Sequence, residues 1–172
     1  SVFKHSLKGR VIITAIEVEL SKVANPRLGY GDVVREVEAR GGATLANIRD
    51  AICSIRRSKF PDTAVLGNAG SFFKNPIVER EVAERLLAEY PEMPSYPAAE
   101  EGKVKLAAGW LIDKAGLKGY REGNVGVHER QALVLVNLGG ATGGEVIAFA
   151  EKVVRKVQEK FGIAIAPEVN IL

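Results

Sequence analysis

The chain has few of the residues that build metal sites and disulfide networks. Its 172 residues include one cysteine, Cys53, and two histidines, His5 and His128. A single cysteine excludes an internal disulfide, and two histidines so far apart do not indicate a metal site. Cys53 lies in a helical apolar pattern, which is typical of a core thiol. This composition fits a protein of a reducing cytoplasm.

Long apolar runs and blocks of one charge are also missing. No run approaches the roughly 20 residues that span a bilayer, and the start SVFKHSLKGR has no hydrophobic stretch of a secretory signal. The net charge of +3 is small, and Lys and Arg form no run of five. We therefore expect no membrane and no nucleic acid as partner. A small anionic ligand suits the slight basic excess equally well.

The first third of the chain predicts one strand and one helix. VIITAIEVEL (11–20) is β-branched and then alternates, which predicts a strand with one wet face. The glycines and proline of 21–32 indicate a loop. Thr44 is expected to cap a helix whose last turn carries basic residues suited to the helix dipole. One side of this helix carries apolar residues: Leu45, Ile48, Ile52 and Ile55.

The next segments predict helices separated by loops. Residues 61–70 read as a break between domains. Asn75 and Pro76 predict the start of a helix that ends near Tyr90. The prolines of 90–102 indicate a loop. Apolar residues at helical spacing then predict a helix over 104–115, ended by Gly116.

The last third alternates strand and helix. QALVLVN (131–137) predicts a buried strand. Thr142 and Glu145 form the capping-box pattern of a helix that stops at Gly162. A last strand is interrupted by Pro167, which indicates an edge or a bulge. Without regular alternation of strands and helices, this order predicts an α+β fold. We expect two parts, residues 1–62 and 63–172.

Spacing alone singles out few functional residues. GNAGS (67–71) has neither the spacing of a phosphate loop nor that of a Gly-x-Ser-x-Gly elbow. A triad of Ser71, His128 and Asp113 can be written down, but any chain of this size permits one. From spacing alone, Ser71 is either a residue that only forms part of a turn or a catalytic residue.

Several blocks together resemble one family. GNAGSFFKNP (67–76), Tyr96-Pro97, VKLAAGWLID (104–113), QALVLVN and the terminal PEV (167–169) occur in this order. They are similar to the UDP-N-acetylenolpyruvoylglucosamine reductases of bacterial peptidoglycan precursor synthesis, in their type I branch. The resemblance runs along the whole chain.

The resemblance implies a flavoenzyme. In that family NADPH reduces FAD, and the flavin reduces UDP-N-acetylglucosamine enolpyruvate to UDP-N-acetylmuramate. Ser71 matches the serine that donates the proton, and Glu168 matches an assisting glutamate. A positioned hydroxyl suffices as acid for a strongly basic carbon. From the residues alone, Glu168 would be a solvated glutamate of an edge strand.

The resemblance also implies substrate-binding residues, each with a simpler alternative. Tyr30 matches a tyrosine of a loop that closes over the UDP part, and is otherwise a surface aromatic. Lys59 matches a lysine near the diphosphate, and also suits its helix end. Asn75 matches a substrate contact, although its capping role would explain it. Further matches or anion contacts are Arg56, Tyr96 and Gln131.

The chain departs from the family pattern at its start. The FAD-binding region and a Tyr-Arg-Asp segment, whose arginine holds the substrate carboxylate, have no counterpart here. The chain thus resembles the C-terminal part of the enzyme, with residues 1–62 as a remnant of the FAD-binding domain. We expect it to retain no FAD and to be inactive alone. Its strand at 11–20 would expose an edge through which copies could associate.

Two other functions stay open at this point. The chain could be a stand-alone module that binds a UDP-sugar or nucleotide without redox activity. It could also be a mildly basic RNA-binding domain, although no recognised RNA motif is present.

Overall fold

The structure is a computed structural model that describes residues 2–4, 6–7, 9–29 and 31–171. Its chain divides into two compact units, Ser1–Ala51 and Ile52–Leu172. None of the described helices is long and apolar enough to cross a membrane.

The first unit contains little regular structure. Besides the first part of α2, which is described below, it contains a 3-10 turn, η1 (Val2–Lys4), and the short helix α1 (Val33–Glu38), which buries Val33 and Val37. The predicted strand at 11–20 is wrong for this structure, in which these residues form no strand. A strand exists only where a neighbour accepts and donates its backbone hydrogen bonds. Within the described part of the chain, no backbone hydrogen bond joins 11–20 to a neighbour.

Helix α2 (Leu45–Lys59) begins where the sequence predicts. The Thr44 hydroxyl accepts a hydrogen bond from the Asn47 amide at 3.1 Å, which confirms the cap. The last turn is basic, as expected. The predicted apolar side is not buried along its length, because Leu45 and Ile52 are exposed. Helical periodicity shows which side can be buried, but not whether this chain covers it.

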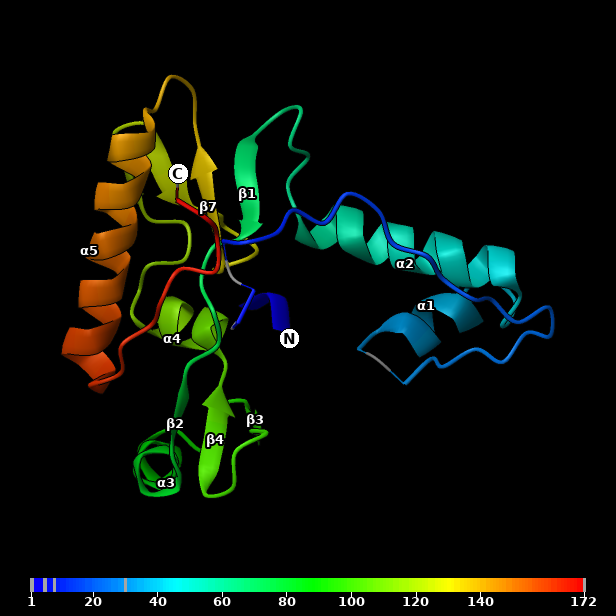
Figure 1. The fold of residues 1–172 in the computed structure, drawn as a ribbon, viewed down its shortest axis with the longest axis horizontal. Helices are drawn as coiled ribbons and strands as arrows, with labels where there is room; N and C mark the ends of the chain where they lie inside the picture. The colour runs from blue at the N-terminus through cyan, green and yellow to red at the C-terminus, as the bar shows by residue number, and fades with distance from the viewer. Residues whose placement is uncertain (1, 5, 8, 30, 172) are drawn as a thin grey trace. The chain divides into compact units, whose positions relative to one another are not determined.

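The second unit contains two antiparallel sheets (Figure 1). The four-stranded sheet has the order β1-β7-β6-β5. Its strands are β1 (Gly67–Ser71), β5 (Arg121–Glu122), β6 (Val125–Val127) and β7 (Val134–Asn137). The three-stranded sheet has the order β2-β4-β3, formed by β2 (Ile77–Glu79), β3 (Ser95–Pro97) and β4 (Lys103–Leu106). The predicted buried strand at 131–137 is confirmed over the residues of β7.

The three-stranded sheet corrects two predictions. The helix expected from Asn75-Pro76 begins only at Arg80, as α3 (Arg80–Glu89), because Ile77–Glu79 pair with β4 instead. The predicted loop at 90–102 contains β3, which pairs with the other side of β4. In both places a distant strand decides the local conformation, and local propensity does not reveal it.

The helix predicted over 104–115 is correct only in its second part. Val104 lies in β4, and the helix α4 spans Ala108–Lys114. Gly116 follows it with φ of 77°, which supports the predicted glycine stop.

Helix α5 (Gly143–Phe161) confirms its predicted ends. The Thr142 hydroxyl accepts from the Glu145 amide while the Glu145 carboxylate accepts from the Thr142 amide, which completes the capping box. Gly162 ends the helix in the left-handed conformation, with φ of 70°. The helix contacts α4, β6 and β7. Its buried side is formed by Phe149, Ala150, Val153, Val157 and Phe161.

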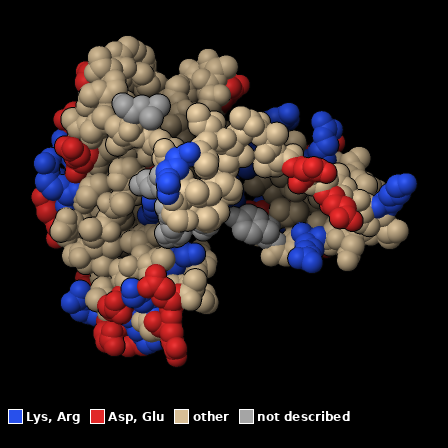
Figure 2. All heavy atoms as spheres, in the orientation of Figure 1, with Lys and Arg blue, Asp and Glu red and all other residues tan. Residues whose placement is uncertain are grey.

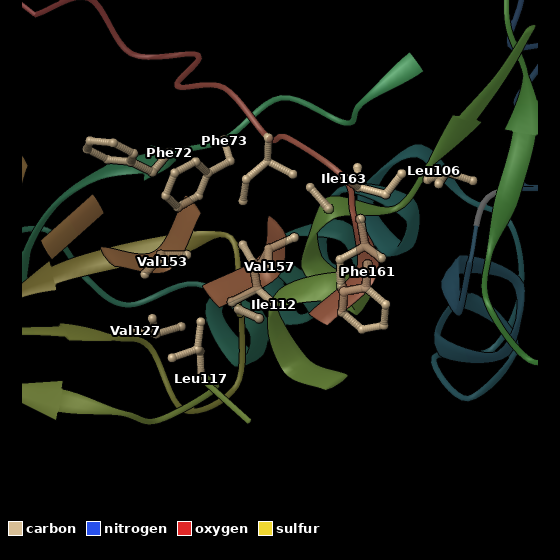
Figure 3. Packing of buried hydrophobic residues seen from close by; sticks show 14 of the residues in the cluster. Phe72, Phe73, Leu106, Ile112, Leu117, Val127, Val153, Val157, Phe161 and Ile163 are labelled. Atoms are coloured by element: carbon tan, nitrogen blue, oxygen red, sulfur yellow. The ribbon is translucent and has the colours of Figure 1, made fainter. Parts of the chain in front are cut away.

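The core of the second unit lies between α5, α4 and the four-stranded sheet. In Figure 3, Phe72 and Phe73 project from the segment after β1 into the cluster that contains Val153 and Val157. Phe73 is only 1% exposed, and its ring centroid lies 5.1 Å from that of Phe72. Burial of each phenylalanine is worth about 1.5–3 kcal/mol. Helices and antiparallel strands thus form an α+β fold, as predicted.

Candidate functional site

The segment that follows β1 is fixed by backbone hydrogen bonds on two sides. Ser71 pairs with Val134 of β7, and the Phe72 amide donates to the Leu133 carbonyl at 2.7 Å. The register of β1 shifts between Asn68 and Ser71. An irregularity of this kind redirects the side chains that follow it, and Ser71 is exposed while Phe72 is buried.

The other side of this segment is bonded to the C-terminal residues. The Lys74 amide donates to the Ala166 carbonyl at 2.9 Å, and the Glu168 amide donates to the Phe72 carbonyl at 2.7 Å. Phe73 and Pro167 form an antiparallel bridge between these bonds. The predicted last strand is therefore wrong as a strand and is reduced to this one bridge. Pro167, which has no amide hydrogen, occupies the pair position where none is needed.

This pairing brings two predicted site residues together. Ser71 precedes the residue whose carbonyl accepts the Glu168 amide, so their backbones are neighbours. Both residues are exposed, whereas Phe72 and Phe73 are buried. The two phenylalanines anchor the backbone, and the hydroxyl-bearing and carboxylate-bearing residues stay accessible.

An apolar cavity borders this pairing. It has a volume of about 490 Å³ and is lined by Phe72, Ala166 and Pro167 together with one side of α5. Its polar lining residues are Glu151, Arg155 and Gln158. A second cavity of about 300 Å³ also borders Phe72 and lies against β1 and β7.

Asn75 and Gln131 both lie near the start of α4. The Asn75 side-chain oxygen accepts a hydrogen bond from the Ala108 amide at 3.0 Å. The prediction that Asn75 is the N-cap residue of α3 is wrong, since that residue is Glu79. Asn75 instead accepts from the first amide of α4, whose own N-cap residue is Ala107. The Gln131 side-chain oxygen lies near Gly109, in the same turn. The structure therefore joins Ser71, Asn75, Gln131 and Glu168 around one segment.

The remaining predicted residues lie elsewhere. Tyr96 is exposed on β3 and pairs with Lys105 in the three-stranded sheet. Arg56 and Lys59 lie in the last turn of α2, and the Arg56 guanidinium lies 5.5 Å from the centre of the Phe60 ring. Tyr30 lies outside the described residues. The substrate contacts of all four stay predictions.

His128 supports the loop that carries Gln131, a role that sequence reasoning missed. It is 6% exposed, and its Nδ1 accepts from the amides of Arg130 and Gln131 at 3.3 and 3.2 Å. Its own amide donates to the Val134 carbonyl at 2.9 Å. No spacing rule would have revealed this, because the partners are backbone groups of its own loop.

Burial lowers the pKa of the His128 imidazole below its ordinary value, with Arg130 adding to the shift and Glu129 opposing it. A neutral ring is also what the loop requires, because a protonated Nδ1 cannot accept hydrogen bonds.

Two other kinds of site find no support in the described residues. They contain no group of three or more His, Cys, Asp and Glu placed to hold a metal ion. The triad of Ser71, His128 and Asp113 is not formed, since the Asp113 carboxylate pairs with Lys118 at 2.9 Å and His128 bonds its own loop. Figure 2 shows basic side chains scattered over the visible face rather than gathered into one broad patch.

Comparison with known proteins assigns the family. Residues 61–172 match the family model of the C-terminal domain of UDP-N-acetylenolpyruvoylglucosamine reductase. The reductase of Chromobacterium violaceum is 56% identical over 174 residues, which cover 100% of this chain and 51% of that protein. The reductase of Pseudomonas aeruginosa is 50% identical, covering 99% of this chain and 50% of that protein.

A solved reductase from Thermus caldophilus is 26% identical, with a TM-score of 0.42 over 73% of this chain and 33% of that one. The family model matched over 61–172 is that of the C-terminal domain of this reductase. The chain belongs to the UDP-N-acetylenolpyruvoylglucosamine reductase family, and it spans about half the length of the curated relatives it matches.

The hydrogen bond from the Ala108 amide to Asn75 predicts a stability effect that a pure substrate contact would not have. Asn75→Ala leaves the Ala108 amide without its acceptor, so we expect the free energy of unfolding to fall by about 0.5–2 kcal/mol. Asn75→Asp keeps the oxygen and is the matched control. Denaturant unfolding of the three proteins measures this, and equal midpoints for Asn75→Ala and the parent would refute this contribution.

The buried His128 predicts a loss of stability in mild acid. Its folded pKa lies below its unfolded value of about 6.5, so the unfolded chain binds the proton more readily. The stability that the neutral His128 contributes is therefore fully present above about pH 6.5, and it is lost as the pH falls through the lower pKa of the folded state. His128→Asn keeps an acceptor but does not titrate. Unfolding curves between pH 7 and 5 should show a shallower pH dependence for this variant, and identical slopes would contradict the assignment.

Proposed function

We propose that this chain supplies the substrate-binding and proton-donating part of an NADPH- and FAD-dependent reductase. The complete enzyme would convert UDP-N-acetylglucosamine enolpyruvate to UDP-N-acetylmuramate for peptidoglycan synthesis. The observation that carries this proposal is the pairing of Phe72–Lys74 with Ala166–Glu168 inside the domain that matches the family. It makes Ser71 and Glu168, far apart in sequence, neighbours on a rigid backbone.

Ser71 would donate the proton that completes the reduction. When an enolpyruvyl double bond gains a hydride at one carbon, negative charge develops on the other carbon and its carboxylate. A carbon so basic takes a proton even from a weak acid, provided that the acid is positioned. The exposed Ser71 hydroxyl is such an acid, since the hydrogen bonds of Phe72 hold its backbone.

Glu168 would act on the same developing charge. Its carboxyl group would lie beside the developing oxyanion of the substrate carboxylate and would assist the stabilisation of the transition state. The hydrogen bond from the Glu168 amide to the Phe72 carbonyl holds Glu168 beside Ser71. Acid and stabiliser would then approach the substrate from adjacent positions.

The binding residues would be divided by their chemistry. Asn75 and Gln131 line the start of α4 and would contact the substrate there, with Tyr96 contributing from β3. Arg56 and Lys59 would meet its anionic groups, and Tyr30 would cover the UDP part. We assign residues 63–172 to the substrate-binding domain and residues 1–62 to the FAD-binding domain of the complete enzyme.

The described residues of this chain do not fit FAD. The cavity beside Phe72 and Pro167, about 490 Å³, is mostly apolar and has Arg155 as the single basic residue of its lining. A flavin dinucleotide needs both room for its ring and several donors for its diphosphate. FAD and NADPH would supply the hydride in the complete enzyme, and this chain would supply binding and the proton.

The chain alone should therefore bind without reducing. A purified sample should show no visible flavin absorption and no oxidation of NADPH when substrate is added. Calorimetry should still detect binding of UDP-N-acetylglucosamine enolpyruvate. A yellow protein that oxidises NADPH in the presence of this substrate would contradict the division of roles. The absence of both binding and activity would count against the proposed substrate.

Ser71→Ala should separate binding from turnover. The test uses a full-length protein in which this chain is joined to the amino-terminal half of the Chromobacterium violaceum reductase. We expect the substrate dissociation constant to stay within about threefold and turnover to fall by about 10²–10⁴-fold, the usual contribution of a general acid. Ser58→Ala is the control, because the Ser58 hydroxyl donates a hydrogen bond to the Ile55 carbonyl of its own helix. Normal turnover in Ser71→Ala would exclude Ser71 as the donor.

A further inference from the structure

The connection between β6 and β7, residues 128–133, supports two parts of the candidate site. Gln131 lies within it, and the Leu133 carbonyl at its end accepts a hydrogen bond from the Phe72 amide at 2.7 Å. Ser71, the residue before Phe72, pairs with the first residue of β7. Hairpin connections usually have about two to five residues, so this longer one needs hydrogen bonds of its own to hold a single conformation.

His128 supplies these hydrogen bonds. Its Nδ1 accepts from the Arg130 and Gln131 amides at 3.3 and 3.2 Å. Within the described part of the chain, neither amide donates to a backbone carbonyl, so both depend on the imidazole as their acceptor. The His128 amide donates to the Val134 carbonyl at 2.9 Å, and the Val134 amide donates to the Gln131 carbonyl at 3.0 Å. One side chain thus fixes the middle of the connection, while backbone hydrogen bonds fix its ends.

The connection also fits closely against the start of α4. A Cβ atom added at Gly109 would lie 3.3 Å from the Leu133 Cγ atom and 3.8 Å from the Gln131 side-chain oxygen. A glycine is therefore what allows the two backbones to approach here, and little room is left for another path of the connection. A change in its conformation would move Gln131 and the Leu133 carbonyl together.

We propose that His128 is a positioning residue for the reaction. Its neutral imidazole places Gln131, the predicted substrate contact, and through the Leu133 carbonyl it places the backbone at Ser71. His128 is not placed to touch the substrate, because it is 6% exposed and its Nδ1 is occupied by its own loop. The proposal rests on the proposed function, in which Gln131 binds the substrate and Ser71 donates the proton.

Protonation of His128 would release the connection. A protonated Nδ1 carries a hydrogen and cannot accept, so the two amides would lose their acceptor. Burial holds the pKa of this imidazole below its ordinary value of about 6.5. The connection is therefore held at neutral pH, and its support is lost as the pH falls through the lowered pKa.

The charged groups around His128 are few. Arg130 lowers the pKa of the imidazole further, and Glu129 raises it. Titratable side chains of the segments packed against the connection are paired with each other: Asp113 with Lys118 at 2.9 Å, and Tyr120 with Glu122 at 2.8 Å. Glu168 belongs to the site itself, so a variant that lacks only the imidazole is needed to isolate the effect of His128.

Amide exchange in this chain tests the contact without any assumption about the reaction. As His128 becomes protonated in an NMR titration, we expect the protection factors of the Gln131 and Phe72 amides to fall at least tenfold. An interior amide of α5, that of Val153, should keep its protection. In His128→Asn, whose side-chain oxygen can accept the same amides but does not titrate, the protection should not change with pH. Constant protection of Gln131 and Phe72 in the parent would overturn the proposal.

Turnover of the joined full-length protein tests the consequence for the reaction. At about pH 7.5, His128→Leu should lower kcat/KM at least tenfold, with KM raised through Gln131 and kcat lowered through Ser71. Far-UV circular dichroism checks that the variant stays folded. His128→Asn should recover most of this loss. Between pH 7 and 5, the parent should lose kcat/KM in a one-proton step that is absent from His128→Asn.

The outcomes separate this proposal from the proposed function. A joined parent protein without turnover would count against the proposed function, and amide exchange would still decide the role of His128. An active parent whose kcat/KM is unchanged by His128→Leu would exclude the positioning role. So would an equal one-proton loss in the parent and in His128→Asn, and this comparison decides the matter if His128→Leu does not fold.

Discussion

Three backbone hydrogen bonds on the segment Phe72–Lys74 are the constraint on which the candidate site depends. One joins Phe72 to Leu133 before β7, and two join Phe72 and Lys74 to the residues around Pro167. The segment is therefore the meeting point of a strand edge and the C-terminal residues. Because Phe72 and Phe73 are buried in the same core, any shift of this backbone would also disturb core packing.

The C-terminal residues reach this place because of α5. The helix crosses the core, is started by its capping box and is stopped by Gly162 in the left-handed conformation. The chain then returns along the core with Ile163 and Ile165 buried. Local signals at the two ends of a helix thus determine where Glu168 lies, although neither signal is near the site.

These local signals are also what the sequence predicts well. The cap at Thr44, the capping box at Thr142 and the glycine stop at Gly162 depend on residues a few positions apart, and the structure confirms them. The strands of the smaller sheet could not be predicted, because Ile77–Glu79 take their conformation from a strand more than twenty residues away. The strand expected at 11–20 fails for the complementary reason. Its pattern is that of a strand, but the described chain offers it no partner.

In the site too, features that depend on distant residues could not be predicted from the sequence. Spacing alone left Ser71 undecided, and only the resemblance of the surrounding blocks pointed to it. The bond from the Ala108 amide to Asn75 could not be predicted, because the two residues are far apart in the sequence. The function of His128 in its loop depends on hydrogen bonds from backbone amides, and the pattern of side chains in the sequence does not reveal such bonds.

The most direct test of this account is an NMR measurement on the bridge between Phe73 and Pro167. In an antiparallel pair of the kind without mutual hydrogen bonds, the two Cα atoms lie about 4.5 Å apart and their hydrogens are closer still. The account predicts a strong nuclear Overhauser effect between the Hα atoms of Phe73 and Pro167. Its absence, in a protein whose β6 and β7 still show their own cross-strand effects, would mean that Ser71 and Glu168 are not held together.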